Sequence, residues 1–380
     1  MTASDIFDPA PVDAALEAAV GARLAGAVVR ICVDGAEIYA RAAGFADREA
    51  GRAMAMNDIF LFASVSKPIV SLAALRLVDE GVLALDAPVT DWLPQFRPAL
   101  PDGRRPAIAI WNLLSHTAGL GYRFLEDLDG PYHRLGISTG FDGIEDTLDG
   151  VVARLAQAPL LYPPGEGWSY SMATDVLGAV VAAAAGSTLP AAVRDLVTGP
   201  LGLEADFASP DPARRVVHYA DGEPRPVRMA GRHVVPYFGT PVEFDPDRLD
   251  RPGAWPSAGA GMAGTAGDAL KALETLRTGG SLIRPDTLAK AHDLHSLPAE
   301  GVSGPGWGFG LASAVLDDPA AAGAPHSAGT LAWGGAFGHS WFIDPDRALT
   351  VVALTNTAFE GMSGRFPIEL RDAVYAALGA

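Results

Sequence analysis

A serine and a lysine stand three residues apart in Ser64-Val65-Ser66-Lys67, at the start of an apolar segment. A serine hydroxyl is a poor nucleophile until a neighbouring base removes its proton. Positions three apart on a helix lie on the same face, so the Lys67 amine would lie beside Ser64 Oγ. This Ser-x-x-Lys motif predicts a serine hydrolase that works through an acyl-enzyme.

The residues after Ser64 predict a helix over Ser64–Glu80 that ends at Gly81 and is apolar on nearly every face. Such a helix is typical of the middle of a protein, where low-dielectric surroundings favour the neutral amine that can act as a base. Serine is a favoured N-cap, and the positive end of the helix dipole would stabilise negative charge there. Pro68 is tolerated because it falls in the first turn.

Two other motifs could carry different chemistry. Gly136–Gly140 reads G-x-S-x-G, the nucleophile elbow, but that motif needs a strand before it and a helix after it. Loops flank it here, so a polar loop is the better interpretation, with Ser138 as the alternative nucleophile. Gly259–Gly264 reads G-x-G-x-x-G, but the preceding Arg251–Pro256 cannot form the central parallel strand of a dinucleotide site. Close backbone packing ahead of a helix at Asp268–Thr278 explains it.

The histidines show no spacing typical of a metal site, and we predict neither a metal nor another cofactor. His116 is expected to hold a loop by hydrogen bonding. The role of His339 stays open, because it lies near a motif described below.

Strand-like segments occur near both ends of the chain, and mostly helical patterns with long loops fill about 85–207. The segments are Ala27–Val33 and Glu37–Ala42, which form a hairpin, then Gly308–Val315, Thr330–Trp333, Ser340–Ile343 and Leu349–Thr355. This order predicts an α+β fold in which the N- and C-terminal parts form one central antiparallel sheet with flanking helices. We expect a discontinuous sheet domain (1–84 and 206–380), a mostly helical inserted domain (85–205) and an active site between them.

The composition excludes several classes of partner. With 49% hydrophobic and 19% charged residues the chain is globular, and its net charge of −17 argues against nucleic acids and anionic membranes. The longest uncharged apolar stretch, Val176–Ala185, is about half of a membrane span. The acidic N-terminus does not resemble a secretory signal, and the single Cys32 excludes an intrachain disulfide. These features predict a cytoplasmic protein.

Five segments in order along the chain resemble one known family. They are FASVSKP (62–68), LLSHTAGL (113–120), PPGEGWSYS (163–171), GAGMAGTAGD (259–268) and WGGAFGHSWFIDP (333–345). The chain is similar, from about residue 12 to residue 378, to serine hydrolases of the class C β-lactamase and penicillin-recognising fold, above all to the family VIII carboxylesterases. Several ordered motifs are far more specific than one Ser-x-x-Lys.

The resemblance implies a role for residues of three motifs. Ser64 and Lys67 match the nucleophile and its lysine partner. Tyr170, in Tyr170-Ser171-Met172, matches the tyrosine that acts as general base or proton shuttle. Trp333-Gly334-Gly335 takes the place of Lys-Thr-Gly, so the backbone N–H groups of Ser64 and Ala336 would form the oxyanion hole.

Two positions depart from the β-lactamase pattern. Trp333 replaces the lysine that would hold a substrate carboxylate, and Met172 replaces an asparagine that would bond a β-lactam side chain. Both changes make the site more apolar, and we expect a neutral ester as substrate. Nearby aromatic side chains could line the pocket or belong to the core, namely Tyr122, Phe124, Trp168 and Phe337.

The sequence therefore predicts a serine carboxylesterase acting on small, short-chain neutral esters, without cofactor or metal. A β-lactamase, a D-amino-acid peptidase or an acyltransferase could use the same site. A non-catalytic, ligand-sensing relative is a further alternative. The sequence determines neither the physiological ester nor the oligomeric state.

Overall fold

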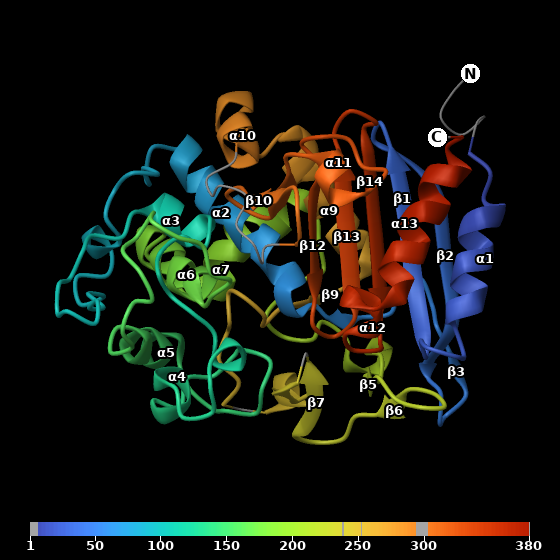
Figure 1. The fold of residues 1–380 in the computed structure, drawn as a ribbon, viewed down its shortest axis with the longest axis horizontal. Coiled ribbons are helices and arrows are strands. Elements are labelled where there is room, and N and C mark those ends of the chain that lie inside the picture. The colour runs from blue at the N-terminus through green and yellow to red at the C-terminus, as the bar shows by residue number, and fades with distance from the viewer. Residues whose placement is uncertain (1–6, 238, 252, 294–302, 380) are drawn as a thin grey trace.

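The fold is built on an eight-stranded antiparallel sheet, which a computed structural model describes together with its helices over residues 7–237, 239–251, 253–293 and 303–379 (Figure 1). The strands follow the order β10-β11-β12-β13-β14-β1-β2-β3. Their bounds are Gly26–Val33 (β1), Ala36–Asp47 (β2), Arg52–Ala53 (β3), Trp307–Phe309 (β10), Ala314–Leu316 (β11), Leu331–Gly335 (β12), His339–Asp344 (β13) and Leu349–Thr355 (β14). β1 pairs with β14, which confirms the predicted sheet from both ends of the chain.

The first hairpin has the predicted turn. Asp34 and Gly35 both have positive φ, 50° and 79°, as a type I′ turn requires. The predicted single strand Gly308–Val315 is instead two short strands, β10 and β11. A turn closed by Gly310 N–H donating to the Ser313 carbonyl separates them.

Helices cover both faces of the sheet. α1 (Ala10–Ala19) and α13 (Arg365–Ala377) pack against each other and, through Leu16, Phe366 and Leu370, against one face. α9 (Ala266–Thr278) packs against β1 and β14 on the other. β1 is therefore covered on both sides, which explains its nearly continuous apolar sequence.

The nucleophile segment leads into α2 (Ser66–Asp79), which is buried between α9 and α6 (Ala173–Ala184). The remaining helices of the middle segment are short, at Ile110–Leu114 (α3), Pro131–Arg134 (α4), Leu148–Leu155 (α5), Leu189–Val193 (α7) and Gly199–Leu201 (α8). α2 thus lies between the helical segment and α9, the helix that packs on the sheet. α10 (Pro285–His292) contacts both α2 and α9.

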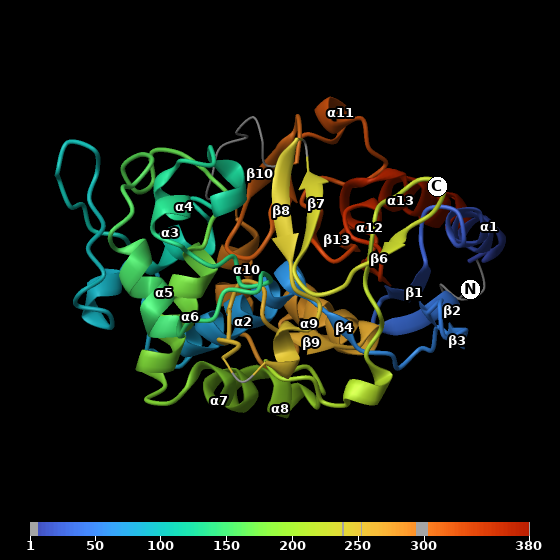
Figure 2. The same cartoon turned by 90° about the horizontal axis from the view of Figure 1, so that it is seen from below.

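Short strands outside the main sheet were not predicted. β4 (Phe60–Leu61) pairs with β9 (Ala263–Gly264), and β5 (Tyr219–Ala220) with β6 (Val227–Arg228). β7 (His233–Tyr237) and β8 (Thr240–Phe244) form a hairpin (Figure 2). Two short helices, α11 (Pro319–Ala322) and α12 (Glu360–Ser363), complete the C-terminal part.

Candidate active site

Ser64 lies in a 3₁₀ turn, Ala63–Val65, that directly precedes α2. The expectation that Ser64 caps this helix is wrong, because the helix begins at Ser66 and Val65 occupies the N-cap position with helical angles. The Ser64 hydroxyl therefore does not serve as the N-cap of this helix. Ala63 has φ +44°, a left-handed conformation that is costly for a residue with a Cβ and that occurs most often at functional sites.

Distant segments fix this turn. His339 Nε2 lies 2.8 Å from the Leu61 carbonyl oxygen, and Phe62 N–H donates to the Met262 carbonyl at 2.9 Å. A Cβ at Gly335 would lie 2.5 Å from the Phe62 carbonyl oxygen, so only glycine lets β12 pass so close. His339, whose role the sequence left open, therefore ties β13 to the strand before the serine.

Lys67 is buried and its amine has three partners. Nζ donates to Ser64 Oγ at 3.2 Å, to Tyr122 Oη at 3.1 Å and to the Gly259 carbonyl at 2.8 Å. Burial, with the neighbouring Tyr170 and Asp175, raises the pKa of Tyr122 well above its usual value, so this residue stays a neutral phenol.

Tyr170 completes the contacts of the serine. Its hydroxyl donates to Ser64 Oγ at 2.6 Å and accepts from Trp333 Nε1 at 3.3 Å. The following residue, Ser171, holds Tyr170 in place through His116, whose Nδ1 lies 3.0 Å from Ser171 Oγ. Burial and the nearby charge of Lys67 hold the pKa of His116 well below its usual value, so the imidazole is neutral. His116 thus has the loop-holding role that was expected.

Asp175, on α6, is a buried carboxyl that the sequence did not single out. Its Oδ1 accepts from Ser257 Oγ at 2.7 Å and from the Gly259 amide at 3.1 Å. Burial raises its pKa above the ordinary value, against the lowering effects of Ser257 and Lys67. Asp175 therefore holds the loop whose carbonyl binds Lys67. The sequence did offer one signal for this role, because Asp175 is an acidic residue in the first turn of an otherwise apolar helix.

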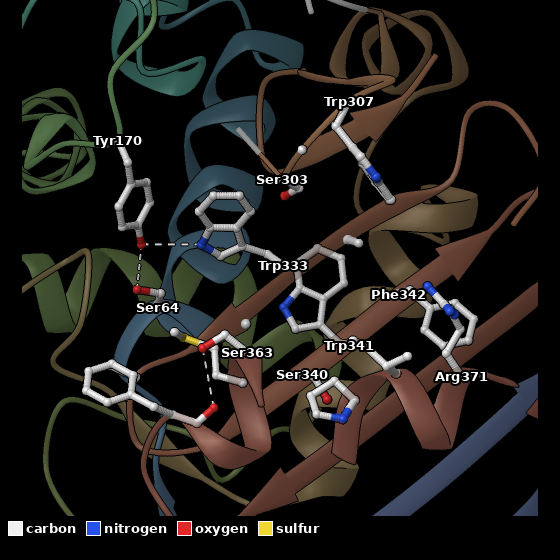
Figure 3. A pocket seen from close by; sticks show the side chains of 18 of the residues that line it. Ser64, Tyr170, Ser303, Trp307, Trp333, Ser340, Trp341, Phe342, Ser363 and Arg371 are labelled. Atoms are coloured by element: carbon white, nitrogen blue, oxygen red, sulfur yellow. Dashed lines mark hydrogen bonds between the residues drawn. The ribbon is translucent and has the colours of Figure 1, made fainter. Parts of the chain in front are cut away.

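A cavity of about 900 Å³ opens at Ser64 (Figure 3). Of the residues expected to bind substrate, its lining includes Phe124, Trp333, Gly334 and Ala336, as well as Ser64 and Tyr170. Tyr122, Met172 and Phe337 are fully buried in the core instead, and Tyr122 contacts Lys67. Gly335 faces the Phe62 carbonyl. Aromatic residues that the sequence did not single out also line the cavity, among them Trp307, Trp341 and Phe342.

The rival motifs have structural roles. Ser138 is buried, donates to Asp142 Oδ1 at 2.6 Å and accepts from Trp255 Nε1 at 3.1 Å. Within the described residues no group of three or more His, Cys, Asp or Glu could hold a metal ion. In that same part of the chain no single helix is long and apolar enough to cross a membrane. Only α6 taken with Leu189–Leu201 reaches that length, with a bend of 81° between them.

Comparisons with known proteins agree with this geometry. Residues 12–376 match the Beta-lactamase family. The chain belongs to this family. It is 56% identical to Esterase EstB of Burkholderia gladioli, over 93% of this chain and 91% of that protein. These matches confirm the predicted resemblance.

Solved structures extend the comparison to the whole fold. EstCE1, described as a hydrolase with promiscuous acyltransferase activity, superposes with a TM-score of 0.94 at 46% identity and covers 96% of this chain and 98% of its own. A mutant of simvastatin synthase from Aspergillus terreus has a TM-score of 0.75 at 21% identity, covering 100% and 99%, and shares the fold. The predicted α+β class is confirmed.

Proposed function

We propose that this protein is a serine carboxylesterase that hydrolyses neutral esters through an acyl-enzyme on Ser64. The observation that carries the proposal is the convergence of Lys67 Nζ and Tyr170 Oη on Ser64 Oγ, at 3.2 and 2.6 Å, at the wall of a mainly aromatic and aliphatic cavity. Similarity to Esterase EstB supports the ester as the substrate class.

The geometry supports the following reaction. The Lys67 amine accepts the proton of Ser64, whose Oγ forms a bond to the ester carbonyl carbon as the C=O π electrons move onto the oxygen. The amides of Ser64 and Ala336 would stabilise the oxyanion, since the close passage of Gly335 holds the end of β12 against the nucleophile turn. When the C–O bond to the alcohol breaks, Tyr170 gives its phenolic proton to the departing alcohol and regains a proton from Lys67. Water repeats these steps on the acyl-enzyme, releases the acid and restores Ser64.

The surroundings of Ser64 favour an uncharged ester. Trp333, in place of a lysine, donates its indole N–H to Tyr170 and offers no cation to a carboxylate beside the scissile bond. Met172 is buried and offers no amide to a β-lactam side chain. Both features argue against a β-lactamase or D-amino-acid peptidase. Short-chain esters fit the cavity, and its volume also leaves room for larger groups.

Acyl transfer is the second candidate reaction. EstCE1 is described as having promiscuous acyltransferase activity, and an apolar cavity can favour an alcohol over water as the acyl acceptor. The joint presence of Ser64, Lys67 and Tyr170 in hydrogen-bond contact argues against a non-catalytic, ligand-sensing relative.

The matched pair Ser64→Ala and Ser138→Ala tests the proposal with p-nitrophenyl butyrate. We expect Ser64→Ala to lower kcat by at least about 1,000-fold and Ser138→Ala to keep it, because a lost nucleophile typically costs that much or more. Loss of activity in Ser138→Ala alone would refute the assignment. Added alcohols report acyl transfer as transesterification products, and nitrocefin turnover reports β-lactamase activity.

We further propose that the active site lies between the sheet part (1–84 and 206–380), which supplies Ser64, and the helical part (85–205), which supplies Tyr170. A cytoplasmic location stays a prediction that rests on the sequence.

A further inference from the structure

The cavity at Ser64 has an extension that the proposed reaction does not use. It passes Trp333 and runs over β12, β13 and β14 to α13, and we call this extension the α13 arm (Figure 3). The strands contribute Ala332, Ser340, Phe342 and Val351 to its walls, and α13 contributes Pro367, Ile368, Leu370 and Arg371. Neighbouring strands lie about 4.8 Å apart, so the arm spans roughly 10 Å from β12 to β14.

The walls of the arm are apolar, and its charge is at the far end. Among the described residues that line the cavity, Arg371 is the only one with a charged side chain. His326, nearby, is neutral, because burial and the charge of Arg371 lower its pKa to about 4. A protein of net charge −17 thus presents no carboxylate in the described lining and one guanidinium.

Arg371 already forms an ion pair, but it can bind a second carboxylate in addition to the first. Its guanidinium contacts Asp372 at 2.8 Å. Asp372 is 57% exposed at the side chain and is not among the lining residues, whereas Arg371 is 22% exposed. A guanidinium has five N–H donors, so it can bind a second carboxylate while it keeps the first.

We propose, on the basis of the proposed esterase function, that the α13 arm binds an ester chain that ends in a carboxylate. The chain would lie along Phe342 and Ile368, and the carboxylate would accept hydrogen bonds from Arg371. Trp333 supplies no cation to pair with a carboxylate next to the scissile ester. A carboxylate on the substrate would therefore have to lie farther along the chain, where Arg371 can bind it. Because an extended chain zigzags, about eight C–C bonds of about 1.5 Å cover the roughly 10 Å from β12 to β14, and the stretches from Ser64 to β12 and from β14 to Arg371 require a longer chain.

The probes are mono-p-nitrophenyl esters of dicarboxylic acids of about eight to about sixteen carbons, which cover the stretch from β12 to β14 and leave length for both ends. Each is compared with a neutral partner in which the far carboxylate is a methyl ester. We expect one chain length at which kcat/KM for the carboxylate form exceeds that for its partner by about 10-fold, as for a hydrogen bond to a charged group. Acetate esters of hydroxy acids of the same lengths place the carboxylate on the alcohol side and show which half of the ester enters the arm.

Variants on α13 assign the effect to one side chain. Arg371→Gln should abolish the preference, Arg371→Lys should keep part of it, and neither should alter hydrolysis of p-nitrophenyl butyrate. Arg365→Gln is the matched control, since Arg365 lies on the same helix, is 77% exposed and does not line the cavity.

Two outcomes separate this inference from the proposed function. In the first, the ratio of kcat/KM for the carboxylate substrate to kcat/KM for its methyl ester is the same in wild type and in Arg371→Gln, in both substrate series. That result would overturn the proposed role of the α13 arm and leave the esterase proposal intact. A wild-type protein that does not hydrolyse p-nitrophenyl butyrate refutes the esterase itself.

Discussion

Replacing Gly259 by alanine tests whether the position of the Lys67 amine limits catalysis. The backbone of Gly259 is outside the left-handed region, so alanine can adopt its conformation. The added Cβ, however, would lie 2.8 Å from Asp175 Oδ2, 3.2 Å from Lys67 Nζ and 3.4 Å from Tyr122 Oη. Asp175 is held by Ser257 and by the Gly259 amide, so the methyl group must displace the lysine amine or the loop.

The expected effect follows from the size of this overlap. The methyl group approaches the carboxylate oxygen about 0.7 Å closer than a carbon normally does, since favourable contacts begin at about 3.5 Å and this one is at 2.8 Å. A misplacement approaching 1 Å at a catalytic group can cost about 100-fold in rate, and overpacking a core costs about 1–3 kcal/mol. We therefore expect Gly259→Ala to lower kcat by about 10- to 100-fold, with little change in KM.

The assay measures kcat and KM for p-nitrophenyl butyrate well below the Tm of each variant, with the Tm taken from thermal unfolding. Gly121→Ala is the control, because its Cβ would meet nothing closer than 3.5 Å although Tyr122 is the next residue. A folded Gly259→Ala protein with wild-type kcat, or an equal loss in Gly121→Ala, would refute the reasoning.

Two more predictions concern Tyr170 and His339. Tyr170→Phe removes the hydroxyl that donates to Ser64 Oγ at 2.6 Å. Steady-state kinetics should show kcat lowered about 100- to 10,000-fold at nearly constant KM, because a general acid–base group usually contributes that much. Burial lowers the pKa of His339 to about 4, so the unfolded chain binds a proton on this imidazole more tightly than the folded protein does. The free energy of unfolding should therefore fall as the pH drops from 6.5 to about 4. The fall is at most about 3 kcal/mol from this residue, and denaturant titrations at several pH values should show a shallower dependence in His339→Gln.

Local patterns in the sequence determined much of the fold. Alternating and apolar runs located β1, β12, β13 and β14, and the Asp34-Gly35 turn located the first hairpin. The main errors lay at element ends, as for Ser64, because a 3₁₀ turn and the first turn of an α-helix have similar sequences.

The sequence by itself predicted Ser64 as the nucleophile, and its contact with Lys67 follows from local backbone geometry because the two residues are close along the chain. The other contacts of the site depended on tertiary structure. Tyr122 and Gly259 bind the lysine from 55 and 192 residues away, and Tyr170 reaches the serine from 106 residues away. Only the family resemblance indicated Tyr170. Gly259 opens a segment that carries this resemblance, but nothing indicated that its carbonyl binds Lys67.

Which aromatic side chains face the cavity was likewise decided by packing. All four of the following side chains are buried from solvent, but Tyr122 and Phe337 do not line the cavity, whereas Trp341 and Phe342 do. Hydrophobicity predicts that such side chains leave water, but burial in the core and exposure to an apolar cavity have nearly the same sequence signal. The path of the α13 arm and the position of Arg371 at its end follow from how α13 packs on the sheet. The tertiary structure thus decided the shape of the substrate site, and the sequence decided its chemistry.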